Sequence, residues 1–348
     1  MSDFSRGAAT HLTKRHSKPR TTKSIQVSHL SRSLLDVLDP ERERVSYCKR
    51  WAIWSKKYLK AGKQSFTPFR CNICGRHTSY PRAEMSRELW SCVHCSSNVR
   101  WRSIIHALSM ELFDRSLAIN DFPSSPGIIG IGLSDWKGYG GRLGKSLGYT
   151  NTYYHTDPRL DITNIDPSQC GLYDFIISSE VFEHVLPPVS KAFENARRLL
   201  KPGGVLILTV PYVEGTTREH FPGVQKISIK ESDGELALHG EFSDGQIQVF
   251  KDIKFHGGPG STLEMRLFGK DSLLREFENA GFDSVCVHDE VVEEFGIYWN
   301  PYDAERAPYR PLLYGADTPP WAGRVSSETV LDGSAPAPST DRRARGEA

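Results

Sequence analysis

Four cysteines occur in two closely spaced pairs whose spacing is typical of a metal site. Cys71-x2-Cys74 and Cys92-x2-Cys95 are separated by 17 residues, a distance within the range of four-cysteine zinc sites. Each pair forms a tight turn that points two thiolates at one tetrahedral ion. Four thiolates fill its coordination sphere, so we expect a structural Zn²⁺. The alternative, a redox CxxC motif, explains one pair and leaves the other unexplained.

A glycine-rich turn follows an apolar run and marks a second candidate site. Residues 127–132 read GIIGIG, which predicts a strand that ends in a turn where backbone N–H groups can approach a ligand closely. The segment 130–135 reads GIGLSD and lacks the third glycine of the dinucleotide-binding fingerprint. The sequence therefore counts against NAD or FAD as the ligand.

An acidic residue follows the next predicted strand, at 152–155. Asp157 lies some 25 residues beyond the glycine turn, where a carboxylate can hold a ribose diol. The alternative is a turn aspartate before Pro158. Asp161 and the backbone of Ile162 come next and are candidates to contact a base ring.

Polar residues gather after two apolar strands in the segment 173–211. The runs 174–179 and 205–210 are predicted as buried parallel strands, joined by a helix ending near Leu200. Carboxyl ends of parallel strands share one sheet edge, where ligands bind. This edge is expected to carry Ser179, Glu180, Glu183 and His184.

The stretches GIIGIGLSDW, YYHTDPRLDITNID, YDFIISSEVFEHV and LLKPGGVLILTVP resemble, in order and spacing, the motifs of class I S-adenosylmethionine-dependent methyltransferases. The resemblance covers roughly residues 126–287 and is strongest in the segment 173–211. It implies an α/β fold with a doubly wound, seven-stranded, mainly parallel sheet, helices on both faces and an antiparallel last strand. This fold would be preceded by a small zinc knuckle, an arrangement similar to certain sugar C-methyltransferases and ribosomal-RNA methyltransferases.

The same resemblance implies roles for individual residues. Ile128 stands where the family usually has an acidic residue, and Asp135 is the candidate to replace it. Ser179 and Glu180 would line the methyl-transfer mouth. The implied cofactor-binding residues are Gly130, Ile131, Gly132, Asp135, Asp157, Asp161, Ile162, Ser179 and Glu180.

Three histidines are candidates for a general base, because an oxygen or nitrogen acceptor that loses a proton benefits from a group with a pKa near neutrality. His184 ranks first, since it is expected beside the cofactor, and a structural role is its alternative. His220 and His256 lie in an insert at about 213–266. The insert also holds a predicted hairpin at 235–250 and a glycine-rich loop at 255–262 that can wrap a phosphate or a sugar, or simply connect strands.

Other elements support these sites. An amphipathic helix is expected at 98–113, and strands at 282–287 and 293–299 are expected to complete the sheet. Aromatic residues repeat at helical spacing from Tyr47 to Tyr58 among lysines and arginines. This face either docks on the core or binds a polyanion.

The sequence predicts a basic disordered tail at 1–30, a helical and zinc-knuckle region at 31–115, a methyltransferase domain at 120–315, and a disordered tail at 318–348. Mean hydropathy is -0.44, and no run is long enough for a membrane helix. The basic N-terminus lacks an apolar signal segment, so we expect a cytoplasmic protein.

Three functions remain open. The first is a methyltransferase for a small-molecule, sugar or glycan acceptor. The second is an RNA methyltransferase docked by the knuckle and the basic N-terminal region, where residues 1–100 hold 20 Lys and Arg against 7 Asp and Glu. The third is a non-catalytic binding protein of the same fold. The oligomeric state is left open.

Overall fold

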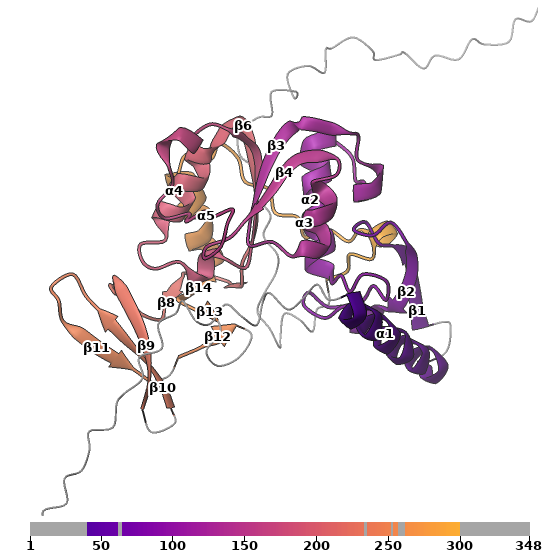
Figure 1. The fold of residues 1–348 in the computed structure, drawn as a ribbon, viewed down its shortest axis with the longest axis horizontal. Helices are drawn as coiled ribbons and strands as arrows, with labels where there is room; N and C mark the ends of the chain where they lie inside the picture. The colour runs from indigo at the N-terminus through magenta and orange to yellow at the C-terminus, as the bar shows by residue number, and fades with distance from the viewer. Residues whose placement is uncertain (1–39, 62–64, 233–234, 252, 257–261, 300–348) are drawn as a thin grey trace, which may run out of the picture.

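The computed structural model describes residues 40–61, 65–232, 235–251, 253–256 and 262–299 (Figure 1). The predicted tails at 1–30 and 318–348 and most of the glycine-rich loop lie outside these residues. No helix in the described ranges is both long and apolar enough to cross a membrane.

Four parallel strands form the central sheet. Their order is β4 (Leu147–Thr152), β3 (Ser125–Leu133), β5 (Tyr173–Ser179) and β6 (Leu200–Thr209), and each neighbouring pair is parallel. The chain runs from β5 through helix α4 to β6, as the predicted crossover requires. The carboxyl ends of all four strands therefore meet at one edge of the sheet.

Helices cover both faces of this sheet (Figure 1). Phe175 and Ile177 pack into a cluster with α2 (Val99–Phe113) and α3 (Lys137–Leu143). The intervening Ile176 belongs to the opposite cluster, with α4 (Ser190–Leu199) and α5 (Lys270–Asn279). Alternate side chains of a strand point to opposite faces, and here both directions are apolar because both are buried. The doubly wound α/β fold is thus confirmed.

Two strands expected from the sequence are absent among the described residues. The segments 282–287 and 293–299 form no ladder, and the second contains only a short 3₁₀ turn, η8 (Glu293–Phe295), closed by a bridge between Val292 and Ile297. Phe282, Val285 and Val287 still pack against the core. Their alternating pattern reflects burial rather than strand pairing, so the predicted count of seven strands is not confirmed.

The strand expected at 152–155 begins and ends earlier, as β4 (Leu147–Thr152).

Three short strands form a separate small sheet beside the central one, in the order β7 (Tyr212–Val213), β14 (Arg266–Gly269) and β8 (Arg218–Glu219). The remaining 3₁₀ turns are η4 (Arg82–Glu84), η5 (Ile119–Asp121), η6 (Pro167–Gln169) and η7 (Phe182–His184).

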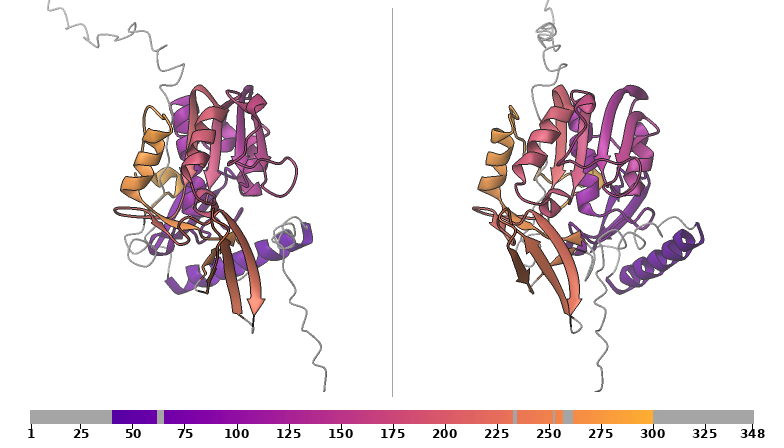
Figure 2. Two further views of the ribbon diagram at one scale, coloured as in Figure 1. Left: turned by 90° about the vertical axis from the view of Figure 1, so that its left-hand side faces the viewer. Right: turned by 60° about the vertical axis from the view of Figure 1, so that its left-hand side comes forward.

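The insert forms its own antiparallel sheet, in the order β11 (Ile247–Phe250), β10 (Glu235–Glu241) and β9 (Lys226–Ser232). The predicted hairpin is confirmed as β10 and β11. Two residue pairs join β12 (Phe255–His256) to β13 (Thr262–Leu263). Figure 2 shows that the three-stranded sheet extends away from the helices and the central sheet.

The N-terminal part comprises helix α1 (Pro40–Ala61) and the hairpin of β1 (Phe66–Arg70) and β2 (His77–Pro81). The Trp54 indole donates a hydrogen bond to the Ser79 carbonyl at 2.7 Å. Tyr58 stacks on Trp54, with ring centroids 5.0 Å apart. The aromatic face of α1 therefore docks on the rest of the protein, which is the first of the two interpretations of this pattern.

The segment that holds both cysteine pairs, residues 66–100, is called the cysteine-rich segment. It ends in the first turn of helix α2, which joins it to the sheet. Its predicted range is confirmed to within one residue, and the Asn98 side chain caps its N-terminus by accepting from Trp101 N. The fully buried Arg102 donates to Ser91 Oγ and to the Gly296 carbonyl, both at 2.8 Å. One core cluster includes cysteines of the pairs, α2 and the sheet. The domain boundary predicted near residues 115–120 therefore comes directly after helix α2, whose side chains pack in one core with both the cysteines and the sheet.

Candidate active site

Backbone strain marks the carboxyl edge of the sheet. Ser134 after β3 and Glu180 after β5 both have φ of 57°, a left-handed conformation that costs a residue with a Cβ about 1 kcal/mol or more. The Ser134 amide donates to the Thr152 carbonyl, and the Glu180 amide donates to the Thr209 carbonyl, each at 2.8 Å. Ser134 thus adopts the backbone conformation favoured by the glycine that the family motif has at this place. Such strain often occurs at functional sites.

The two glycines of the turn are required for close packing. A Cβ on Gly130 would overlap the ring of Phe175, and one on Gly132 would overlap the Tyr149 hydroxyl and the Asp135 carboxylate. The rings of Tyr149 and Phe175 lie parallel, with centroids 6.0 Å apart. The side-chain face of this glycine run is therefore filled by aromatic rings, and the Ile131 side chain packs into the opposite cluster.

Asp135 is held inside the protein rather than projecting from the turn. Its Oδ2 accepts from the Tyr149 hydroxyl at 2.6 Å, and its backbone exchanges two hydrogen bonds with the Asn151 amide. Burial raises the pKa of this carboxyl to about 7, although the hydrogen bond from Tyr149 opposes the shift. Asp135 thus orders the turn through Tyr149 and Asn151.

The loop after β4 presents an exposed carboxylate. Tyr153 N donates to the Pro158 carbonyl and Leu160 N to the Tyr153 carbonyl, at 2.9 and 3.0 Å, which closes the loop. Asp157 is exposed at its tip, and its side chain makes no hydrogen bond or ion pair within the described residues. A free carboxylate at this edge fits the predicted contact to a ribose diol.

Asp161 and Ile162 lie further along the same connection. The Asp161 carboxylate accepts from the amide and the hydroxyl of Thr163, at 2.9 and 2.7 Å. The Ile162 side chain is buried in the core, and its carbonyl accepts from Asn195 at 2.8 Å. These bonds anchor the connection, and the roles of both residues toward an adenine ring stay predictions.

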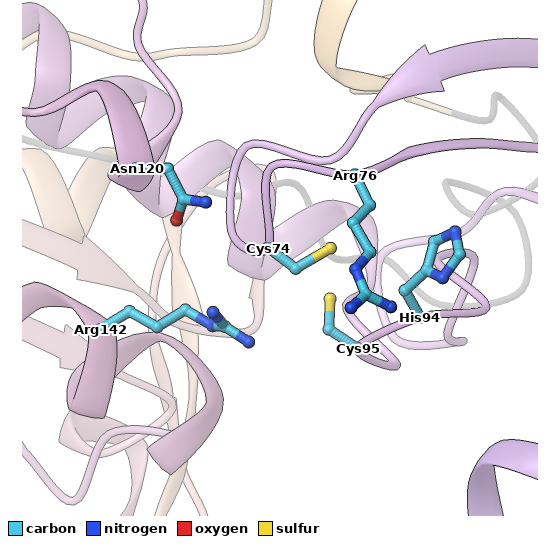
Figure 3. Close-up of a pocket in the computed structure, with 6 residues that line it drawn as sticks. All are labelled: Cys74, Arg76, His94, Cys95, Asn120 and Arg142. Atoms are coloured by element: carbon cyan, nitrogen blue, oxygen red, sulfur yellow. The ribbon is translucent and has the colours of Figure 1, made fainter.

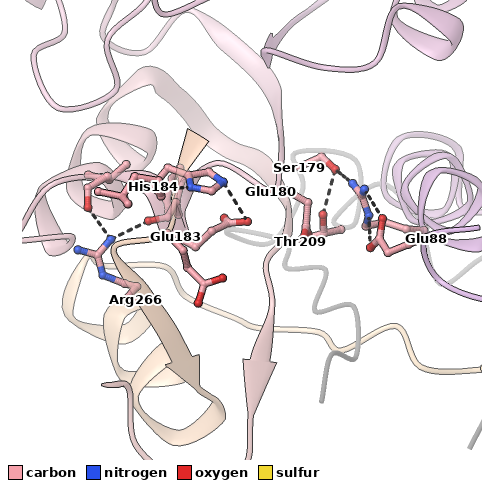
Figure 4. A network of polar contacts seen from close by, with 12 residues as sticks. Glu88, Ser179, Glu180, Glu183, His184, Thr209 and Arg266 are labelled. Atoms are coloured by element: carbon pink, nitrogen blue, oxygen red, sulfur yellow. Dashed lines mark hydrogen bonds and ion pairs between the residues drawn. The ribbon is translucent and has the colours of Figure 1, made fainter. Parts of the chain in front are cut away.

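Two arginines that flank the second cysteine pair reach the edge after β5, where Ser179 and Glu180 lie (Figure 4). Arg87 donates to both carboxylate oxygens of Glu180, at 2.6 and 3.3 Å. Arg100, in the first turn of α2, donates to Ser179 Oγ at 2.5 Å. It also forms a two-bond ion pair with Glu88, at 2.7 and 3.0 Å. Both arginine side chains are at most 10% exposed, so these contacts are shielded from solvent.

These contacts set the charge state of the edge. Burial alone would raise the pKa of Glu180, but the charges of Arg87 and Arg100 outweigh it and lower that pKa to about 2. Burial, together with the charge of Glu180, raises the pKa of the neighbouring Glu183 well above its usual range. Hence Glu180 is ionised and paired at neutral pH, whereas the surroundings of Glu183 favour its protonated form.

His184 follows on η7, close to the same edge. Its Nδ1 donates to the Leu263 carbonyl at 2.7 Å, a contact that needs the proton on Nδ1, and its Nε2 lies 3.6 Å from Glu183 Oε1. Arg266 fixes η7 by donating to the carbonyls of Phe182 and Val185, at 2.8 and 2.6 Å. In the neutral ring this tautomer leaves a lone pair on Nε2.

The other two candidate histidines belong to the insert and its border. The His220 Nε2 lies 2.8 Å from Glu264 Oε1, and its amide donates to the Met265 carbonyl. His256 lies in β12, and its side chain falls outside the described residues. Of the three histidines, His184 alone lies in the connection directly after β5.

The four predicted metal ligands converge. Their sulfur atoms all lie within 4.8 Å of one another, with 3.6 Å between Cys71 and Cys95 and 3.8 Å between Cys74 and Cys92. Zinc–sulfur bonds of about 2.3 Å in a tetrahedron place sulfurs about 3.8 Å apart. The cluster Cys71, Cys74, Cys92 and Cys95 therefore fits a Zn²⁺ ion.

A cavity of about 380 Å³ adjoins this cluster (Figure 3). Arg76 and His94 line it from the cysteine-rich segment, and Arg142 lines it from α3. A zinc ion with four thiolates carries two negative charges, which the two guanidinium groups offset in part. None of the residues that line this cavity is among those labelled in the polar network of Figure 4.

Sequence reasoning overlooked Arg87 and Arg100. Neither belongs to a motif or an apolar period, and their partners are 93 and 79 residues away in the chain. Basic residues in a basic segment give no signal of burial. The role of Arg266 was also missed: it is fully buried and holds η7 by hydrogen bonds to the Phe182 and Val185 carbonyls.

Asp135→Asn tests the buried carboxyl. Because folding raises the pKa of Asp135, its protonated carboxyl stabilises the folded state at pH values below the unfolded pKa of about 4. This stabilisation is lost as the pH rises toward 7. Asparagine does not ionise, so the variant does not lose stability in this way. Its free energy of unfolding relative to that of the wild type should therefore rise by up to about 4 kcal/mol between pH 4 and pH 8. Urea unfolding measures this, with the exposed Asp166→Asn as control. A constant difference across this range would show that Asp135 is ionised in the folded protein.

Residues 128–287 match the family described as "Methyltransferase domain". No curated protein matches the chain.

One similar solved structure is a 1,6-didemethyltoxoflavin-N1-methyltransferase from Burkholderia thailandensis. It has 11% sequence identity and a TM-score of 0.35, and the alignment covers 81% of this chain and 92% of that chain. The sugar N-methyltransferase KedS8 from Streptoalloteichus sp ATCC 53650 has 12% identity, 63% and 86% coverage, and a TM-score of 0.33. The CurJ carbon methyltransferase has 17% identity, 65% and 57% coverage, and a TM-score of 0.37.

At these identities and scores the structures carry no inference about substrate. The matched residues 128–287 contain the glycine turn, the Asp157 loop and the β5 edge. The chain therefore contains a methyltransferase domain at residues 128–287.

Proposed function

We propose that the protein transfers a methyl group from S-adenosylmethionine to a small-molecule, sugar or glycan-type acceptor at the edge formed by Ser134, Ser179 and Glu180. One observation carries this proposal. Two buried arginines of the cysteine-rich segment, Arg87 and Arg100, are bonded to Glu180 and Ser179 at the end of β5. The cysteine-rich segment therefore contacts the proposed reaction edge directly.

The ion pair suits the chemistry of a sulfonium donor. Methyl transfer is an in-line displacement in which the sulfonium loses its positive charge, so positioning supplies much of the rate. An unpaired carboxylate beside the sulfonium would stabilise the reactant more than the transition state. Because Arg87 neutralises Glu180, this edge keeps a polar anchor without that penalty.

The burial of the arginines favours a small acceptor over a polynucleotide. Their side chains are 5% and 10% exposed and already bonded, so they offer no extended cationic surface to a phosphate backbone. RNA remains a second candidate because of the cavity lined by Arg76, Arg142 and His94. RNA binding that weakens steeply with added salt would favour this alternative, whereas no binding at low salt would exclude it.

Cofactor binding should depend on Asp157. Replacing it with Ala removes the charged acceptor for the ribose hydroxyls, so calorimetry should show S-adenosylhomocysteine binding about 10- to 100-fold more weakly. Asp166→Ala changes another exposed carboxylate of the same connection and should leave affinity unchanged. Equal affinity of wild type and Asp157→Ala would place the ribose elsewhere. Absence of any binding by the wild type would instead favour an inert protein of this fold.

We further propose His184 as the general base, with its Nε2 lone pair accepting a proton from the acceptor. His184→Gln keeps a donor for the Leu263 carbonyl but removes the base. Single-turnover methyl transfer to the acceptor found by screening should slow by about 10²- to 10⁴-fold, with cofactor affinity unchanged. His220→Gln is the matched variant. If it slows the reaction more than His184→Gln does, the assignment moves to the insert.

The cysteine cluster is proposed to hold a structural Zn²⁺. None of the seven cysteines forms a disulfide, which supports the reducing cytoplasm as the proposed location. Metal analysis after dialysis should give about one tightly bound zinc per chain. Strong chelation should unfold the cysteine-rich segment, because zinc binding contributes folding free energy. A metal-free sample with unchanged thermal stability would contradict this role.

A further inference from the structure

A second group of metal-ligating side chains lies apart from both the cysteine cluster and the sheet edge. His106 belongs to α2, whereas His288 and Glu290 belong to the irregular segment 281–292 that follows α5. The two imidazole side chains are 8% and 10% exposed, and the Glu290 side chain is 49% exposed. Two elements far apart in sequence thus meet through side chains that metals commonly bind.

The three potential ligand atoms converge on a small volume. Glu290 Oε1 lies 2.9 Å from His106 Nε2 and 3.4 Å from His288 Nδ1. One ligand atom from each of the three residues lies within 4.8 Å of the others. Bonds of about 2.1 Å to a tetrahedral ion place ligand atoms about 3.4 Å apart. The two carboxylate–imidazole distances therefore lie within about 0.5 Å of the spacing that an ion requires.

The remaining nitrogen of each imidazole faces a polar side chain. His106 Nδ1 makes a hydrogen bond with Ser116 Oγ at 2.5 Å, whereas His288 Nε2 lies 3.9 Å from Glu111 Oε1, which is beyond a hydrogen bond. Metal-binding histidines almost always bond through their second nitrogen, as His106 does, which fixes the ring and directs the first nitrogen to the ion. The two rings stand at 87° to each other. They approach the shared carboxylate from different directions, as ligands of one ion do.

Hydrogen bonding is the simpler explanation of these contacts. A carboxylate oxygen can face two imidazole nitrogens only if each nitrogen carries a proton or a cation lies between them. A single divalent ion can replace both protons and satisfy the carboxylate at once.

We propose that His106, His288 and Glu290 bind a second divalent cation, preferably Zn²⁺, and thereby fasten the segment 281–292 to α2. Two imidazoles and one carboxylate form a ligand set that suits Zn²⁺ and other late first-row ions. With three protein ligands, a fourth position remains for solvent, so this ion exchanges more readily than one held by four thiolates. The Trp299 indole donates to the Glu290 carbonyl at 3.1 Å and holds the segment in place.

Zinc titration of the full chain tests this site. The protein is first loaded at the cysteine cluster and freed of weakly held metal by dialysis. Calorimetry with ZnCl₂ should then reveal one further equivalent. Glu290→Gln and His288→Gln should weaken this equivalent by more than about 100-fold, whereas Ser116→Ala, which removes only an outer partner, should weaken it about 10- to 100-fold. Asp289→Asn alters a neighbouring exposed carboxylate and should bind as the wild type does.

Cobalt distinguishes the two sites. Co²⁺ added to the zinc-loaded protein should give weak visible bands without intense thiolate charge-transfer absorption, and Glu290→Gln should abolish these bands. Because Glu290 is half-exposed, this variant should remain folded, and circular dichroism checks that it does. The proposal is overturned if the wild type binds no equivalent beyond the cysteine cluster. It is also overturned if Glu290→Gln binds the added equivalent as Asp289→Asn does.

Discussion

The ion pair between Arg87 and Glu180 is the interaction on which the rest of the site depends. It joins the cysteine-rich segment to the end of β5, and Arg100 reinforces it through Ser179. A largely buried carboxylate is costly without a partner, and Glu180 also takes a strained left-handed conformation. The arginines therefore allow the edge to hold an ionised carboxylate where a cationic donor is proposed to bind. The cysteine cluster matters here because Arg87 and Arg100 flank its second pair in the chain.

Local sequence patterns predicted much of the fold. Helix α2, strand β5, helix α4 and the β10–β11 hairpin follow from periodicity and turn residues, and their positions are confirmed. The cysteine cluster was likewise predictable, because two CxxC pairs have few other uses in such a chain. The strands expected after α5 were wrong. Phe282 and Val285 pack on the core without pairing, and apolar alternation cannot distinguish these two states.

The polar details of the edge could not be predicted. The contacts of Arg87 and Arg100 connect parts of the chain about 80 to 90 residues apart, and no local rule specifies such pairs. Asp135 was recognised as unusual, but its burial under Tyr149 depends on the aromatic ring that Gly132 admits. Likewise, the convergence of His106 with His288 and Glu290 requires α2 to pack beside the chain after α5. From the sequence alone, His106 falls only on or near the apolar face of its helix.

A structure of the protein with bound S-adenosylhomocysteine tests the central claim most directly. The account predicts the cofactor between the glycine turn, the Asp157 loop and the end of β5, with Arg87 still paired to Glu180 beside the empty methyl position. A cofactor bound elsewhere, or an Arg87 turned away from Glu180 in the complex, would contradict it.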